Sequence, residues 1–415
     1  MTQWNPVWRV KANGTDVTDI ALTNLSISAG RSDFNANTLP SYCSLTLINT
    51  TNTVYNWTIN TAITVEVQDS TGTYVTIFGG RISDIAIEVN STGSVGPVTR
   101  ISITALGALS KLQRALFDGN LAEGLDGAQI TELLSDLLLA SWNEVPPALT
   151  WATYDPTEIW TNAGNVGLGT IDTGEYTLVS RQITDTYLAP IANQIASSAL
   201  GYLYEDPQGR ISYADASHRQ DYLESNGYTE LDGNHALGSG ISAVTRQGNI
   251  VNSLTVNYGN NFNSSYLSED TISQSNYGLY GEEFISYLKN AADVEDFADK
   301  VIALRANPYA EFKSITFPLQ SSEIDDADRD ALLNTFMGLP VAINNLPANI
   351  SGGSFLGFVE GWSFRASVGG LYITLNMSPA EFNTFTEAWE DVAATLTWAT
   401  MSAILTWQNA TGVIS

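Results

Sequence analysis

The stretch GGRISDIAIEV, residues 79–89, decides the fold, because its last two isoleucines and its final valine alternate with smaller or charged residues. A period of two is that of a strand that buries one face. AITVEVQD at 62–69 and VTRISITAL at 98–106 continue this period, and NSTGSVGP at 90–97 forms a long hairpin connection. The sequence therefore predicts a β unit over residues 1–115.

The same pattern recurs near the end of the chain, in FLGFVEGWSFRAS at 355–367. The matching pairs are Gly80 and Gly357, Ile82 and Val359, Ile85 and Trp362, and Ile87 and Phe364. The next segment, GGLYITLNMSP at 369–379, alternates in the same way as residues 98–106. Internal repeats indicate repeated structural units, so we expect two tube-like β-barrels in one chain.

A second repeat contains tryptophans, in SWNEVPPALTWATYDPTEIWTNA at 141–163 and AWEDVAATLTWATMSAILTWQNA at 388–410. Each copy places tryptophans nine residues apart: Trp142, Trp151 and Trp160, then Trp389, Trp398 and Trp407. Neither a helix nor a strand would put that spacing on one face. Three interpretations stay open: segments folded over their own domains, arms that dock on other subunits, or exposed rings that stack on sugars.

Between the two β units, the apolar period becomes helical. Residues 127–140 and 184–201 each place apolar side chains on one stripe, and Gly201 ends the second helix. A Tyr-rich hairpin at 202–213 follows, around the turn Asp-Pro-Gln-Gly. These elements predict a small α/β module.

The third region begins with a strand at 250–259, which we expect to lead into a polar loop at 259–276. Helical periodicity returns within 293–308 and 321–340, and residues 312–320 read as a strand. We therefore assign this region to a second β-barrel that carries helices.

Three acids in this region have the spacing of a calcium-binding loop, namely Asp326, Asp328 and Asp330. Such a loop needs a glycine and a bidentate glutamate, and Ala331 and Met337 stand in those positions. A helix N-terminus, where the helix dipole favours acids, explains the cluster better.

Composition excludes several classes of function. The chain has 415 residues, a net charge of −27 and only 17 Lys and Arg, so it lacks the basic footprint of a nucleic-acid binder. The acidity serves either solubility or a surface that repels a polyanion. A single cysteine, Cys43, excludes a disulfide framework and reads as a buried strand residue. We find neither a signal peptide nor a membrane-spanning segment.

Catalytic and metal motifs are missing from the sequence. The only two histidines, His218 and His235, lie in polar contexts without a histidine at helical spacing, so we expect surface or turn residues rather than zinc ligands. We therefore predict no catalytic, cofactor-binding or metal-binding residues, and no cofactor.

The chain resembles phage tail hub proteins, the minor tail proteins of long-tailed phages, which are similar to the baseplate hub of contractile tails. GRSDFNANTLPSYCSLTLIN at 30–49 is typical of their opening, ALGYLYEDPQGRISYADASHR at 199–219 of their middle domain. The hairpin pattern falls on Gly80, Arg81, Ile82, Asp84, Ile85, Arg100, Ile101, Ala105, Leu109, Leu112 and Arg114. The closing strands match at Leu346, Pro347, Val359, Glu360, Gly361, Thr374, Leu375, Ser378 and Pro379.

The resemblance implies a homotrimer in which each chain supplies two barrels, so that three chains make a pseudo-sixfold ring. Such a ring joins a hexameric distal ring or tube protein to a threefold tip, and the other expected partners are a tape measure protein and tip fibre or receptor-binding proteins. DNA would pass through without specific binding, along a channel that we expect to be acidic. Longer members of this family carry a lysin or peptidase domain after the hub region. This sequence ends at Ser415 without one, so we expect that the protein is not an enzyme.

We therefore expect a mainly β protein with α+β parts in four segments: a first hub barrel at 1–115, an α/β module at 116–240, a second hub barrel at 241–378 and a tryptophan arm at 379–415. The six tryptophans would dock on partners, and Gly80, Ile82, Ile85, Gly357, Val359 and Trp362 would form the ring hairpins. The protein would lie at the tail tip of the virion after synthesis in the host cytoplasm. The alternatives are a carbohydrate-binding tail-tip adhesin and, third, a cell-wall hydrolase.

Overall fold

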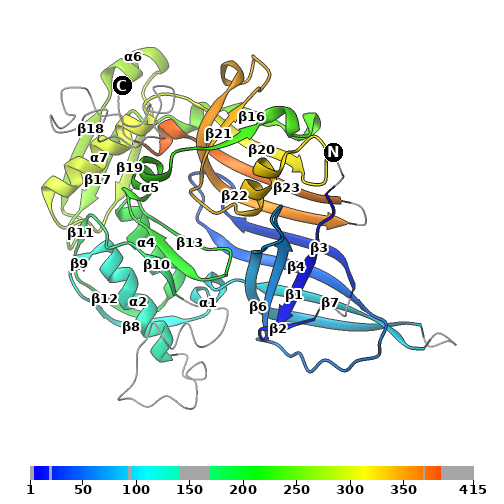
Figure 1. Ribbon diagram of the computed structural model, residues 1–415. Helices are drawn as coiled ribbons and strands as arrows, with labels where there is room; N and C mark the ends of the chain where they lie inside the picture. The colour runs from blue at the N-terminus through cyan, green and yellow to red at the C-terminus, as the bar shows by residue number, and fades with distance from the viewer. Residues whose placement is uncertain (1–3, 18–20, 92–95, 141–167, 368–369, 385–415) are drawn as a thin grey trace.

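The structure, a computed structural model, describes residues 4–17, 21–91, 96–140, 168–367 and 370–384. Strands dominate in two lobes, shown in Figure 1, which confirms the prediction of a mainly β fold with α+β parts. The larger sheet forms one lobe, coloured blue and orange, and smaller sheets with most of the helices form the other.

The large sheet has 13 strands and contains both ends of the described chain. Its N-terminal strands are β1 (Trp8–Ala12), β2 (Thr15–Asp16), β3 (Ala21–Gly30), β4 (Leu39–Asn49), β5 (Ala62–Gln68), β6 (Tyr74–Ser91) and β7 (Val98–Leu106). Its later strands are β15 (Thr229–Asp232), β16 (Ser242–Thr245), β20 (Ala310–Pro318), β21 (Pro340–Asn344), β22 (Phe355–Ser367) and β23 (Gly370–Pro379).

The sheet consists of two units with the same strand order. The first unit runs β3-β4-β7-β6-β5-β1, and the second runs β16-β20-β23-β22-β21-β15. Corresponding neighbours pair antiparallel in both units, except that β15 lies parallel to β21 whereas β1 is antiparallel to β5. The repeat seen in the sequence is therefore a repeat of topology.

The two units do not form the two separate closed barrels that the sequence led us to expect. Within the described residues, β22 pairs with β3 of the other unit, and the hydrogen-bonded path ends at β16 on one side and at β2 on the other. The reason is that the edge strand β3 finds its partner in the neighbouring unit rather than across its own unit. One open sheet results.

Alternation along the strands places one shared core on one face of this sheet. Leu25, Ile27, Cys43, Leu45 and Ile103 are each at most 1% exposed. The later unit contributes Phe364, Ile373 and Leu375 to the same cluster. Cys43 lies between Ile27 and Ala105 on adjacent strands, as predicted for a buried strand residue, and burial raises the pKa of its thiol far above the ordinary value.

The second lobe surrounds a separate core that spans residues 108–306. Its first part contains α1 (Leu109–Leu112), β8 (Leu116–Leu121), β9 (Gly124–Leu125), α2 (Asp126–Ala140), β10 (Leu168–Ile171), β11 (Thr177–Leu178), β12 (Arg181–Tyr187), α4 (Leu188–Ser198), β13 (Tyr202–Glu205), β14 (Ile211–Ala214) and α5 (His218–Asn226). Its second part contains β17 (Ser253–Tyr258), β18 (Ser264–Glu269), α6 (Thr271–Tyr277), β19 (Gly281–Ile285) and α7 (Ala291–Arg305). The segment boundaries drawn from the sequence stay a prediction, although this core joins parts of three segments.

The polar loop predicted at 259–276 is wrong, because β18 and α6 form there. β18 pairs with β17 along its whole length. Asp270 caps α6 by accepting hydrogen bonds from the N–H groups of Ile272 and Ser273 (2.9 and 2.8 Å). Serine and asparagine made this segment look irregular, yet one capping aspartate and cross-strand pairing suffice to order it.

Several other local predictions are confirmed. α2 begins one residue before the predicted helix at 127–140, and α4 forms within the predicted helix at 184–201, although residues 184–187 belong to β12. β13 and β14 form the predicted hairpin. The acidic cluster begins α8 (Asp326–Leu333), where the Asp325 side chain accepts from the Asp328 N–H (2.8 Å). No helix among the described residues is both long and apolar enough to cross a membrane.

Candidate functional site

The predicted hairpin residues occupy equivalent places in β6 and β22. Each strand pairs with its hairpin partner, β7 or β23, and each has a bulge shortly after its glycine, between Ile82 and Asp84 or between Val359 and Gly361. The bulge stands at the same place in the aligned repeats. Their role in a ring stays a prediction, and the six predicted docking tryptophans lie outside the described residues.

The two hairpin glycines meet the same constraint. A Cβ atom at Gly80 would lie 2.6 Å from the ring of Phe78, and one at Gly357 would lie 2.6 Å from the ring of Phe355. In both units a phenylalanine two residues earlier covers the glycine, and the backbone carbonyl of the partner strand, at Leu106 or Ser378, lies against it. A side chain at either position would push the hairpin apart.

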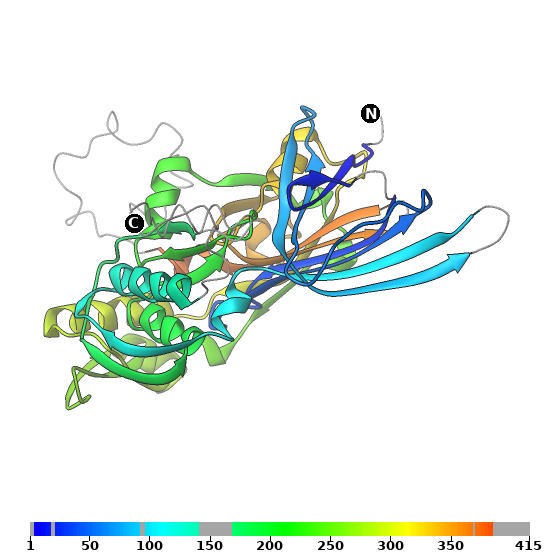
Figure 2. The ribbon, with the colours of Figure 1, turned by 90° about the horizontal axis from the view of Figure 1, so that it is seen from below.

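The two strands differ in what lies beside their second halves. Residues 361–366 of β22 pair with residues 25–30 of β3, whereas β5 reaches only as far as Arg81 along β6. Accordingly Phe364 is 1% exposed, while its counterpart Ile87 is 61% exposed and Val89 is 63% exposed. The outer half of β6, which we define as residues 83–91, is therefore an unpaired apolar sheet edge, and Figure 2 shows its hairpin extending beyond the lobe.

A second unpaired edge lies at the opposite end of the sheet. β16 pairs with β20 on one side only and ends the hydrogen-bonded path of the described strands. By strand order, β16 is the counterpart of β3. Within one chain, β3 and β22 form one such junction. β16 and the outer half of β6 are the two strands that a second junction of the same kind would need.

The extra residue of the β22 bulge is Glu360, a 1% exposed carboxylate. It accepts hydrogen bonds from Arg219 of α5 (2.7 and 3.0 Å) and from Arg31, which follows β3 (2.6 Å). Burial opposes its ionisation, but the two guanidinium groups outweigh burial and hold the pKa of this carboxyl well below its usual range. Glu360 therefore joins the second β unit to the first unit and to the α/β lobe.

A matching contact without a counter-charge joins the first unit to that lobe. Glu205 of β13 is 3% exposed and accepts hydrogen bonds from the N–H groups of Ser41 (2.7 Å) and Leu109. Burial raises the pKa of this carboxyl to about 7. One interlobe carboxylate is thus held charged by arginines, while the pKa of the other lies close to physiological pH.

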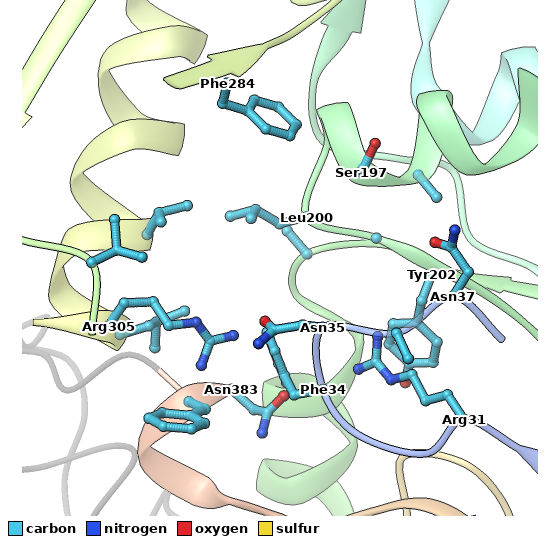
Figure 3. A pocket seen from close by; sticks show the side chains of 18 of the residues that line it. Arg31, Phe34, Asn35, Asn37, Ser197, Leu200, Tyr202, Phe284, Arg305 and Asn383 are labelled. Atoms are coloured by element: carbon cyan, nitrogen blue, oxygen red, sulfur yellow. The ribbon is translucent and has the colours of Figure 1, made fainter. Parts of the chain in front are cut away.

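A cavity of about 530 Å³ lies between the two lobes, beside Glu360 and its arginines (Figure 3). Its wall takes residues from the β3–β4 loop, α4, α5, the start of β17, α7 and the residues after β23. Arg31, Arg219 and Arg305 all line it, together with the acids Asp215 and Glu282. Sequence reasoning did not find this cavity, since its residues come from distant segments.

The two histidines form ion-pair contacts rather than a metal site. His218 Nδ1 lies 2.7 Å from Asp172, and His235 Nδ1 lies 2.7 Å from Asp328. They begin α5 and end a short 3-10 turn at 233–235, consistent with the expectation of turn residues. Within the described ranges, no cluster of three or more His, Cys, Asp or Glu side chains could hold a metal ion.

Two copies of one β unit share a sheet, and the chain between them, together with residues 253–305 inserted in the second unit, forms an α/β lobe. No family model matches the chain, and no curated protein matches its sequence.

Solved structures match along almost the whole chain. The 43 kDa tail protein of prophage MuSo2 from Shewanella oneidensis superimposes with a TM-score of 0.55 at 13% identity, covering 91% of this chain and 99% of that one. A tail protein from Neisseria meningitidis MC58 gives a TM-score of 0.59 at 13% identity, covering 92% and 98%. The chain therefore has the fold of phage tail proteins.

Proposed function

We propose that this chain is a structural hub protein of a phage tail, without catalytic activity, and that three copies form a pseudo-sixfold ring at the distal end of the tail. The fold shared with prophage tail proteins supports a role in a tail. The repeated strand order supports the symmetry, because three chains carry six similar units. Such a ring fits a sixfold neighbour on one side and a threefold tip on the other.

The observation that carries this proposal is the β3–β22 junction. Here the edge of one unit pairs with the hairpin strand of the other over residues 25–30 and 361–366. The equivalent elements, β16 and the outer half of β6, have no partner strand there within the described chain. In the ring, β16 of one chain pairs antiparallel with the outer half of β6 of the next, so that all six junctions are alike.

Burial favours this arrangement. Phe364 loses nearly all its exposure at the internal junction, and Ile87 would lose its exposure in the same way at the junction between chains. An unpaired apolar strand edge invites pairing with another chain. Burying an aliphatic side chain contributes about 1.5–3 kcal/mol, so a few such residues at each of three junctions give a stable trimer.

In the proposed ring, the polar face of the sheet lines the DNA channel. Hydroxyls dominate on it, including Ser26, Ser44, Ser102, Thr104, Ser363 and Thr374. Its charges are mixed, with Asp84 and Glu88 beside Arg81, Arg100 and Arg365. In this proposal the wall is not acidic, whereas the net charge led us to expect an acidic channel; which charges face the channel stays a prediction. Passage of DNA would depend on a nearly neutral, hydroxyl-rich wall that forms no lasting phosphate contacts.

The remaining assignments belong to the same proposal. A hexameric distal ring or tube protein would contact one face of the ring, the tape measure protein would end at the channel, and tip fibre or receptor-binding proteins would attach on the threefold side. The segments 141–163 and 388–410 would supply six tryptophan-containing arms for the sixfold neighbour. The protein would then be a component of the virion tail tip.

The test replaces two apolar edge residues by charges, in the double variant Ile87→Asp, Val89→Asp. The matched control is Val54→Asp, which changes an exposed valine (82%) away from the sheet edges. We expect wild type and control to elute as trimers in light scattering and to show threefold rings with a central hole in electron microscopy. The double variant should be monomeric and should keep the wild-type circular dichroism spectrum, which shows that the chain is folded. A monomeric wild type, or a trimeric double variant, would refute the ring.

A further inference from the structure

The interlobe cavity has a polar end and an apolar end. Figure 3 shows Arg305 and Asn35 at the polar end and Leu200 and Phe284 at the other, and Asn249 and Phe297 also line the cavity. A volume of about 530 Å³ lies within the range of small-molecule sites. The chemistry of the two ends indicates what would fill it.

Arg305, the last residue of α7, is a buried cation without a polar partner. It is 8% exposed, and among the described residues its guanidinium makes no ion pair or side-chain hydrogen bond. The rings of Phe34 and Phe382 hold it, with centroids 3.6 and 4.4 Å from its Cζ. Burial, with Arg31 nearby, lowers its pKa to about 9. Nearby Glu360 is engaged with two other arginines, and the buried Glu311 acts on Arg305 electrostatically without a hydrogen bond, so the N–H donors of this guanidinium lack an acceptor among the described residues.

A second donor at this end also lacks an acceptor. The Asn249 side-chain nitrogen is buried and has no hydrogen-bond partner in the described structure. Its segment lies beside Arg305, because the Val251 N–H donates to the Arg305 carbonyl oxygen (3.1 Å). Buried polar groups in folded proteins nearly always have partners, so two orphan donors in one cavity call for an acceptor that the described residues do not provide.

The apolar end is formed by the end of α4 and two aromatic rings. Leu200 points into the cavity from the turn that ends α4, where its φ of 54° accompanies a hydrogen bond from the Gly201 N–H to the Ala196 carbonyl oxygen (2.9 Å). Phe284 and Phe297 stack beside it with centroids 5.3 Å apart. These side chains give this end an apolar wall.

We propose that this cavity binds a carboxylate carried on an apolar group, whose oxygens accept hydrogen bonds from Arg305 and Asn249 and whose apolar part contacts Leu200, Phe284 and Phe297. A carboxylate offers two oxygens to a planar guanidinium that has no hydrogen-bond acceptor within the described residues. The cavity accepts either the C-terminal residue of a peptide or a short free acyl chain. This inference stands independently of the proposed ring.

The test uses calorimetric titration of the full-length protein with four probes. N-acetyl-L-phenylalanine represents a peptide C-terminus, octanoate represents an acyl chain, and N-acetyl-L-phenylalaninamide and inorganic phosphate are controls that lack one half of the chemistry. We expect at least one carboxylate to bind ten-fold or more tightly than both controls. The better carboxylate identifies the source. Equal binding of acid and amide, equal binding of phosphate, or no binding by any probe overturns the proposal.

Variants locate the site. Arg305→Gln should weaken the preferred carboxylate by about 10- to 100-fold, the effect of losing a hydrogen bond to a charged group. Arg210→Gln is the control, since Arg210 is a surface arginine paired with Asp206 (2.6 Å), and its affinity should match wild type. Asn249→Asp places a repelling charge at the second donor without touching the arginines and should also abolish binding. Wild-type affinity in both Arg305→Gln and Asn249→Asp would overturn the proposal.

Discussion

The outer halves of β6 and β22 are one strand in two settings. Both follow a bulge at the same place, yet Phe364 is 1% exposed and Ile87 is 61% exposed. The difference lies in the neighbour, since β3 covers only β22. An apolar position therefore predicts that a partner exists, and only the three-dimensional structure shows whether that partner lies within the chain.

The bulges themselves differ in the same sense. Glu360 at the β22 bulge is buried against Arg31 and Arg219. Ser83, its counterpart in β6, is partly exposed and donates a hydrogen bond to the Thr104 carbonyl oxygen (3.2 Å). The bulge of the second unit therefore contacts the other lobe, whereas the bulge of the first unit lies at the surface. Three predictions test this comparison.

The largest expected effect is that of Glu360→Gln. Removing the carboxylate charge leaves Arg31 and Arg219 buried without a counter-charge, and breaking a buried pair in this way costs about 3–5 kcal/mol. The counterpart change, Ser83→Ala, should cost less than about 0.5 kcal/mol, as surface substitutions usually do. Urea unfolding followed by fluorescence, at concentrations where the chain is monomeric, measures both. Similar losses at the two sites would show that the bulges are equivalent after all.

The next effect compares the two apolar positions directly. Phe364→Ala should lower the free energy of unfolding of the monomer by about 3–5 kcal/mol, because it opens a cavity in the shared core. Ile87→Ala should change it by less than about 0.5 kcal/mol while weakening trimer formation. Chemical denaturation gives the first quantity and sedimentation equilibrium the second. A large loss of monomer stability in Ile87→Ala would mean that β6 is already covered within one chain.

Local periodicity accounts for what could be predicted of the fold. Short stretches of sequence contain the signals for several elements. These signals are the alternation in β6, β7, β22 and β23, the helical stripes of α2 and α4, and the acids that begin α8. The joining of both units into one sheet depends on the pairing of β3 with β22, in which Gly30 lies opposite Gly361. These two residues are more than 300 positions apart in the sequence. No local pattern specifies such a pairing, so two separate barrels were the natural expectation.

The candidate site was less accessible to sequence reasoning than the fold. The sequence singles out Glu360 only as part of the family pattern. A lone glutamate in an apolar strand nevertheless indicates a buried ion pair. Its partners Arg31 and Arg219 lie in unrelated segments. The cavity beside them is lined by segments that are far apart in the sequence, so no local pattern predicts it. In the sequence, Arg305 looks like an ordinary basic residue at the C-terminus of a helix. The tryptophan repeats lie outside the described residues, and their docking role stays a prediction.

The smallest effect separates the two interlobe carboxylates by pH. Burial raises the pKa of Glu205 to about 7, above the ordinary value of 4.5, so the folded state holds its proton more tightly than the unfolded state. Its contribution to stability is complete below about pH 4.5 and is lost as the pH rises through about 7. Glu360 has a depressed pKa, so its contribution is present above its ordinary value and is lost only at much lower pH. Lys111, whose pKa burial and Arg81 lower to about 7, changes stability only above that value.

Between pH 5 and 8, therefore, the difference in unfolding free energy between wild type and Glu205→Gln should fall as the pH rises, by roughly 1–3 kcal/mol. Taking the difference cancels the other acids, and glutamine keeps the side-chain shape without a titrating proton. The same difference for Glu360→Gln should stay flat over this range, because Glu360 is ionised throughout. A flat difference for Glu205→Gln would mean that the N–H groups of Ser41 and Leu109 stabilise the carboxylate enough to offset its burial, so that both junctions are held by charge.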